Sequence, residues 1–344
     1  MEQEVLNALP LLDEKGELNQ VGYAKKLIAD YQRNAIKANK FRIKEWDYYL
    51  IYNGHYGLAL TIADNSYMGL MSASFLDFDH KNETTKSVMT FMPLGKTNFP
   101  NTSVKGDVSF KNKAIDISFE NDGVKRILKC DYPNFKDGKT LSAKVTLSEV
   151  PQDSMVIITP YKEDKKAFYY NQKINCLRAQ GEFTIGDDKY SFLPQDSFGG
   201  LDWGRGVWTY DNVWYWGSAS GLVNNEKFGF NLGYGFGDTT KASENMLFYQ
   251  GKASKLDRVT FNIPKDENGK EEYLKPWKFT SNDGRFEMDF KPILNRKACT
   301  NALVILSDQN QVFGYFTGKA ILDDGIVIEV KDFLGFAEKV RNKW

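Results

Sequence analysis

The segment DSFGGLDWGRGVW, residues 196–208, places Asp202 and Arg205 among glycines and tryptophans. A charged group in an aromatic environment costs free energy unless it is paired. One interpretation is therefore a salt bridge between Asp202 and Arg205 that fixes this segment. The other is a functional acid, because burial beside Trp203 and Trp208 favours a neutral carboxyl that can donate a proton. Arg205 opposes that state, so the second interpretation requires Arg205 to point away.

A second carboxyl, Glu244, follows the polar loop DTTKAS, residues 238–243. Two carboxyls in different environments suit the separate roles of acid and base. The candidate catalytic residues are therefore Asp202, Arg205 and Glu244. The alternative for Glu244 is an exposed position at the start of a strand.

The residues that follow Arg205 predict a β-hairpin in a fixed register. Asn224 and Asn225 tolerate positive φ, so they suit a two-residue turn between strands 213–223 and 226–236. Counting from that turn gives the facing pairs on one side of the sheet: Trp214 and Gly235, Trp216 and Gly233, Ser218 and Asn231, Ser220 and Gly229. The other side is predicted to be core: Val213, Tyr215, Ala219, Phe228, Phe230, Leu232, Tyr234 and Phe236.

The glycines leave the first side of this hairpin almost bare. Either Trp214 and Trp216 lie across the glycines to complete the sheet, or the same side lines a ligand pocket. Ligand pockets are mostly apolar and carry a few polar groups, which agrees with the second interpretation. The candidate ligand-binding residues are Trp203, Trp208, Tyr210, Trp214, Trp216, Ser218, Asn231 and Asp238.

Other common kinds of site have little support in the sequence. GYGFGD, residues 233–238, lacks the spacing of a dinucleotide-binding loop and continues a strand. His55 and His80, together with three widely separated cysteines, do not have the spacing of metal ligands. No serine lies in a GxSxG elbow. We therefore expect no metal and no cofactor.

The composition narrows the class of protein. Lys plus Arg and Asp plus Glu both number 45 in the 344 residues, so the long-range field of a nucleic-acid-binding protein is missing. The N-terminus has no basic and apolar leader, and no run approaches about 18 apolar residues. We predict a cytoplasmic protein without a membrane span or nucleic-acid partner. The sequence does not indicate the oligomeric state.

The pattern of short strands and turns predicts an all-β fold. From Trp46 onward, runs with a period of two alternate with turns such as ADNS, ENDG and KDGK, and the pattern restarts after Pro160. We predict two consecutive antiparallel barrels or sandwiches of the calycin or lipocalin type, at residues 46–170 and 171–344. Apolar spacing predicts a helix or strap within residues 1–45, and a short helix at the C-terminus.

Several motifs together resemble a known family. LDWGRGVWTY, WYWGSASG, NLGYGFGD and ENM, with FMPLGK and the terminal GFAEKVRNKW, resemble the bacterial domain-of-unknown-function family 2804 over nearly the whole chain. An Asp-Trp pair ahead of an aromatic strand is more loosely similar to tandem lipocalin-like proteins, which include carotenoid hydratases and fungal cyclases. That similarity implies an apolar ligand, and it implies Asp202 as a proton donor to an alkene.

Three hypotheses about function follow. The leading one is a protein that binds a hydrophobic small molecule, lipid-like or isoprenoid-like, in a barrel lined by tryptophan. The second is an enzyme that catalyses hydration, dehydration or cyclisation of such a molecule with Asp202 as the acid. The third is an interaction protein without a ligand, for which we expect a filled barrel.

Overall fold

The computed structural model describes residues 2–302 and 305–343, and the regular structure in these residues is almost entirely β-strand. The first sheet is antiparallel, in the order β5-β4-β3-β2-β13-β11-β9-β8-β7-β6, and β10 and β12 also pair with β11. Its strands are β1 (Gly22–Ala24), β2 (Ile43–Tyr52), β3 (Tyr56–Asp64), β4 (Met68–Asp77), β5 (Asn82–Phe91), β6 (Val108–Lys111), β7 (Asp116–Asn121), β8 (Arg126–Lys136), β9 (Lys139–Ser148), β10 (Met155–Pro160), β11 (Phe168–Ile185), β12 (Asp188–Phe192) and β13 (Phe198–Val207).

The second sheet is also antiparallel and has the order β17-β16-β15-β14-β22-β21-β20-β19-β18. Its strands are β14 (Asp211–Val223), β15 (Glu226–Tyr234), β16 (Met246–Tyr249), β17 (Lys252–Lys255), β18 (Val259–Asn262), β19 (Trp277–Ser281), β20 (Phe286–Ala302), β21 (Ile305–Ile321) and β22 (Val327–Lys343). The chain passes from the first sheet to the second between Val207 and Asp211. This passage comes later in the chain than the predicted boundary of the two units, between residues 170 and 171.

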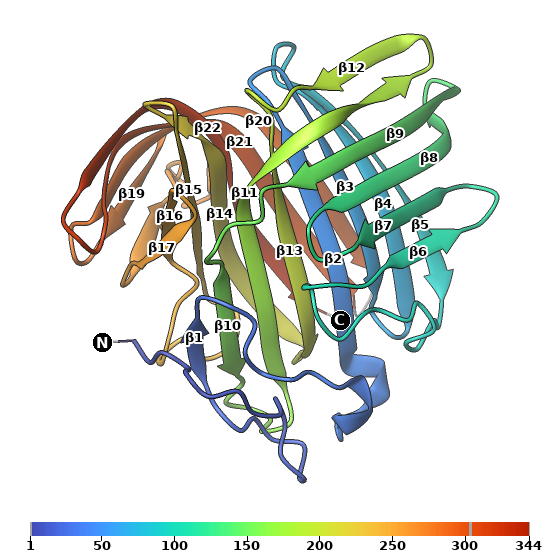
Figure 1. Ribbon diagram of the computed structural model, residues 1–344, viewed down its shortest axis with the longest axis vertical. Coiled ribbons are helices and arrows are strands. Elements are labelled where there is room, and N and C mark those ends of the chain that lie inside the picture. Colours follow the sequence, from blue (N-terminus) through green and yellow to red (C-terminus); the bar gives the residue numbers. More distant parts are fainter. Residues whose placement is uncertain (1, 303–304, 344) are drawn as a thin grey trace.

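Each sheet curls around an apolar core of its own, and the two lie side by side (Figure 1). Strands β11 and β13 of the first sheet contact β14 and β15 of the second. A third cluster joins Tyr48, Leu50 and Tyr52 of β2 to Phe313 of β21 and Phe336 of β22. We call the buried layer between the two sheets the seam. The predicted all-β fold with two lipocalin-like units is confirmed.

The predicted C-terminal helix is wrong, because β22 occupies residues 327–343. The apolar spacing that suggests a helix has another cause: both faces of this strand are buried. Phe333 and Ala337 lie in the second core, whereas Phe336 lies in the seam. A strand that is apolar on both faces loses the period of two.

The N-terminal segment is a strap. It contains β1 and two short 3-10 helices, Arg33–Ala35 and Lys40–Arg42, in place of a continuous helix. Burial here comes from packing on the first sheet: the Tyr31 ring is almost completely buried, and its hydroxyl donates to Glu45 over 2.8 Å. No helix in the described residues is long and apolar enough to span a membrane.

Candidate functional site

The aromatic hairpin forms in the predicted register. Asn224 and Asn225 have φ values of 52° and 65°, as a primed turn requires. Trp216 therefore pairs with Gly233, and Ser218 with Asn231. The register ends at Tyr215 and Tyr234, so the predicted pairing of Trp214 with Gly235 is wrong. Phe236 is buried as predicted, but it lies in the core of the first sheet and not on the core face of the hairpin. Gly235 turns the chain with a φ of 90°, and Phe236 packs against the core of the first sheet.

The bare side of the hairpin lies against strand β11 of the first sheet. A Cβ atom at Gly229 would lie 2.6 Å from the Sγ atom of Cys176 in β11. A Cβ atom at Gly233 would lie 3.0 Å from the Cβ atom of Glu244. The glycines therefore make room for Cys176 and Glu244, and this side of the hairpin forms one wall of the seam.

Strand β11 is bulged at Asn175 and Cys176, where its pairing with β13 shifts register. Cys176 has a φ of 61°, and the bulge directs Asn175 into the second sheet. The Asn175 amide donates to the Ser218 hydroxyl over 2.7 Å and to the Phe230 carbonyl over 3.1 Å. Polar side chains therefore fasten the two sheets together at this end of the seam.

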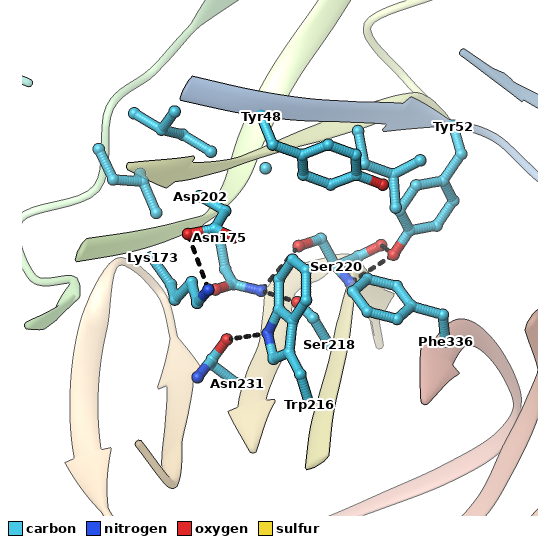
Figure 2. Close-up of a pocket in the computed structure, with 14 residues that line it drawn as sticks. Tyr48, Tyr52, Lys173, Asn175, Asp202, Trp216, Ser218, Ser220, Asn231 and Phe336 are labelled. Carbon is cyan, nitrogen blue, oxygen red and sulfur yellow. Dashed lines mark hydrogen bonds and ion pairs between the residues drawn. The ribbon is translucent and has the colours of Figure 1, made fainter. Parts of the chain in front are cut away.

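Lys173 and Asp202 form an ion pair at the centre of the seam, with 2.8 Å between Nζ and Oδ1 (Figure 2). They come from the paired strands β11 and β13 and face each other in the register. The same carboxylate accepts a hydrogen bond of 2.7 Å from Asn171. The Lys173 ammonium also lies 4.0 Å from the centroid of the Trp216 ring, a cation–π contact. Asp202 therefore pairs with Lys173 and not with Arg205.

Glu244 lies buried next to this ion pair. Asn231 donates to the Glu244 carbonyl over 2.8 Å, and the Glu244 amide donates to the Gly233 carbonyl over 3.1 Å. Burial raises the pKa of Glu244 to about 7, and the Asp202 charge adds to this, although the Lys173 ammonium opposes it. The carboxyl of Glu244 therefore gains or loses a proton near neutral pH.

A third carboxyl, Glu338 of β22, was missed by the sequence interpretation. It accepts hydrogen bonds from the Trp214 indole over 3.0 Å and from the Gln311 amide over 3.0 Å. Burial raises the pKa of Glu338 to about 7 as well, whereas its hydrogen bond from Trp214 lowers it. Lys173 was also missed. Lys173 lies in FYYNQKINCL and Glu338 in FLGFAEKV. A charged residue inside a segment that is rich in apolar residues is the signal that could have identified both.

A cavity of about 20 Å³ borders the ion pair. Its walls include Tyr48, Lys173, Asp202, Trp216, Ser218 and Asn231 (Figure 2). The Trp216 indole donates to Asn231 over 2.8 Å, whereas the buried Tyr48 hydroxyl has no hydrogen-bond partner among the described residues. A space of this size holds one or two water molecules. A larger ligand therefore requires the seam to open.

The structure brings together only some of the predicted site residues. Asp202, Glu244, Trp214, Trp216, Ser218 and Asn231 meet in the seam. Arg205 and Trp203 project from the opposite face of β13 into the first core, where Arg205 pairs with Asp47 over 3.0 Å. Tyr210 is 43% exposed. Asp238 lies 3.8 Å from Lys162 in a surface pair.

A family model for a domain of unknown function, DUF2804, matches residues 2–344. The chain belongs to this family. No curated protein matches the chain in sequence.

Solved structures share the fold at low sequence identity. A putative AttH from Nitrosomonas europaea has a TM-score of 0.55 at 12% identity, and the match covers 90% of this chain and 96% of that one. Kievitone hydratase from Nectria haematococca has a TM-score of 0.52 at 12% identity, with 87% and 88% covered. CghA in complex with Sch210972 has a TM-score of 0.52 at 11% identity, with 97% of each chain covered. The predicted resemblance to a hydratase is thus confirmed at the level of the fold.

Proposed function

We propose that this protein binds a small, largely apolar molecule in the seam and catalyses a proton-dependent reaction on it, a hydration, dehydration or cyclisation. The main support for this proposal is a buried cluster of Lys173, Asp202, Glu244 and Glu338, of which Lys173 and Asp202 line the cavity. Buried carboxyls destabilise a fold unless they are fully paired, and among the described residues only Asp202 of these three forms an ion pair. Carboxyls that titrate near pH 7 are typical of groups that transfer protons.

The chemistry assigns different roles to the carboxyls. Asp202 is the ion-pair partner of Lys173, so it suits the role of an anion that stabilises positive charge. Glu244 and Glu338, whose pKa values lie at about 7, are the candidate proton donors. A neutral glutamic acid protonates an alkene carbon, and the Trp216 ring, which already holds the Lys173 ammonium at 4.0 Å, stabilises the resulting cation. Water addition or ring closure then returns the proton to the carboxylate.

An analogy with one known structure favours a reaction over binding alone. One of the similar structures is described as a hydratase, although at 12% identity it supports the fold and the class of reaction by analogy only. Binding without reaction predicts that the seam carboxyls are dispensable for processing the ligand. The two functions therefore differ in the consequence of removing a carboxyl.

The test is to incubate the protein with a small-molecule extract of its source organism and to follow all species by mass spectrometry. We expect one compound to be consumed and a product to form that differs by one water or is isomeric. Glu244→Gln should lower this rate about 100-fold or more, the usual contribution of a general acid. Glu271→Gln is the matched control, because Glu271 pairs with Lys339 outside the cavity. Rates equal to that of the control in both Glu244→Gln and Glu338→Gln would refute the proposal.

A further inference from the structure

Phe236 lies at the centre of a cage of aromatic side chains beside the seam. It belongs to the loop between β15 and β16, and it is 5% exposed. Four rings meet it nearly edge to face, with centroid distances of 4.6 Å for Tyr169, 4.7 Å for Trp208, 5.2 Å for Trp214 and 5.9 Å for Tyr161. The cage therefore encloses a volume shaped for one six-membered ring.

The backbone on both sides of Phe236 is of a kind that only glycine adopts easily. Gly235 and Gly237 have φ values of 90° and 70°. A Cβ atom would lie 2.9 Å from the Val213 carbonyl at Gly235, and 2.8 Å from the Pro160 carbonyl at Gly237. Loop residues next to glycine are suited to the large φ and ψ changes of a hinge. Phe236 is thus held in the cage by a short segment that has a glycine with positive φ on each side.

Two polar atoms of the cage are not satisfied by the Phe236 ring. The Trp208 Nε1 and Tyr161 Oη atoms are buried and have no hydrogen-bond partner among the described residues. Their side chains are only 8% and 5% exposed. A buried polar group without a partner costs free energy, and the phenyl ring of Phe236 has no oxygen that can accept from these two donors. A ligand ring that carries an oxygen could accept from one of these donors.

The cage is continuous with the proposed reaction site. The Trp214 indole contacts Phe236 and donates to Glu338 over 3.0 Å. Burial raises the pKa of Tyr169, and the nearby Glu244 and Asp202 charges add to this effect. A ring in the position of Phe236 therefore lies next to the carboxyls of the seam.

We propose that Phe236 occupies the binding subsite of a ligand ring, and that the loop swings out at Gly235 and Gly237 to admit it. The ligand is an aromatic or unsaturated ring that carries a hydroxyl or carbonyl oxygen. This inference rests on the proposed function and names its substrate class.

The first test uses Phe236→Ala with phenol and benzene as probes, measured by calorimetry. A buried apolar cavity binds benzene, so any large-to-small variant can do so. The control is Phe230→Ala, because Phe230 is fully buried among the rings of Phe286 and Phe316 in the second core. We expect Phe236→Ala to bind phenol at least tenfold more tightly than benzene, and Phe230→Ala to prefer benzene. Equal affinities in Phe236→Ala would overturn the proposal.

The second test uses the unaltered protein, so it does not depend on the folding of a variant. Phenol should speed hydrogen exchange in residues 235–245, because it displaces Phe236 and releases the loop. Tyr161→Phe should reduce that response at least threefold, since it removes a hydroxyl available to phenol. Unchanged exchange with phenol present would reject the subsite. These experiments measure binding only. Phenol binding combined with full activity of both Glu244→Gln and Glu338→Gln would refute the proposed reaction and leave the subsite intact.

Discussion

Two buried ion clusters lie on opposite faces of β13 and differ in how completely they are paired. Inside the first sheet, Arg205 is completely buried and lies 3.0 Å from Asp47. Its Nη atoms also donate to the carbonyls of Trp46, Gly204 and Pro100 over 2.8, 2.8 and 3.1 Å. These bonds join β2, β13 and the loop before β6. Each carboxyl here has a direct ion pair, because Asp47 pairs with Arg205 and the neighbouring Glu45 pairs with Arg33. These contacts hold the fold together.

In the seam, only Asp202 of the three carboxyls forms an ion pair among the described residues. Lys173 and Lys255 lower the pKa of Glu244, and Arg296 and Lys173 lower that of Glu338, but none of these cations pairs directly with either glutamate. Lys173 and Asp202 line a cavity together with Tyr48. Burial is similar in the two clusters, so burial alone does not mark a functional site. Two buried glutamates that have no ion pair in the described part of the chain, next to a cavity, distinguish the seam. Removing a charged group should therefore lower the stability of the protein in the first cluster and raise it in the seam.

The largest change in stability should be the loss caused by Arg205→Met. This change leaves Asp47 buried without its cation, and burial already raises the pKa of Asp47 although Arg205 opposes it. Removing one partner of a buried ion pair costs about 3–5 kcal/mol of stability. Urea unfolding at pH 7 measures this loss. A loss below about 1 kcal/mol would show that the first cluster does not hold the fold.

The next largest effect, counted for each titrating group, is the dependence of stability on pH. The folded-state pKa values of Glu244 and Glu338, about 7, lie above the ordinary value of 4.5. Their contribution to stability is present below about pH 4.5 and is lost as the pH rises through 7, by about 3 kcal/mol for each group. Urea unfolding between pH 4.5 and 8 should show this decline, and the Glu244→Gln/Glu338→Gln double variant should have a much flatter profile. Identical profiles would contradict the raised pKa values.

The sequence predicted the hairpin correctly because local chemistry fixes it. Asn224 and Asn225 determine the turn, the turn determines the register, and the register puts Trp216, Ser218 and Asn231 on one side. The clustering of these residues follows from counting along two adjacent strands. Glu244 is placed by contacts that are similarly close in the chain, to Gly233 and Asn231.

The missed residues come from strands that are distant in the sequence. Lys173 lies in β11 and faces Asp202 only because β11 pairs with β13. Glu338 lies in β22 of the second sheet, so its approach to Asp202 depends on how the two sheets pack. Strand β22 was also taken for a helix, which hid the face that Glu338 presents. The partner of Asp202 was misassigned for a simpler reason: residues three apart in a strand, such as Asp202 and Arg205, point to opposite faces.

Glu244→Gln should raise the stability of the protein by a smaller amount, whereas Arg205→Met lowers it. At pH 8 the wild-type carboxyl is ionised in a buried position, and glutamine removes that charge while it retains the shape. We expect a gain of about 1–2 kcal/mol in stability, the trade commonly seen when a functional group is removed. Thermal unfolding at pH 8 measures the gain. A loss of stability would indicate that Glu244 serves the fold, as Arg205 does.

The smallest effect should come from Tyr48→Phe. The hydroxyl is buried without a hydrogen-bond partner among the described residues, so its removal breaks no bond of the described protein. Stability should change by less than about 1 kcal/mol. Calorimetry with phenol should also be unaffected, because Tyr48 is not part of the aromatic cage. A large loss of stability would mean that Tyr48 is a structural member of the seam.

The central claim is that the seam carboxyls transfer a proton to carbon, and reaction in deuterated water tests it most directly. The protein and the small-molecule extract are incubated in D₂O, and the product that forms is analysed by mass spectrometry and NMR. For a product that gains water or is isomeric with its substrate, we predict one deuterium bound to carbon in each product molecule. The rate of its formation should fall about 100-fold in Glu244→Gln or in Glu338→Gln. A hydrated or isomeric product without carbon-bound deuterium, or an unchanged rate in both variants, would contradict the account.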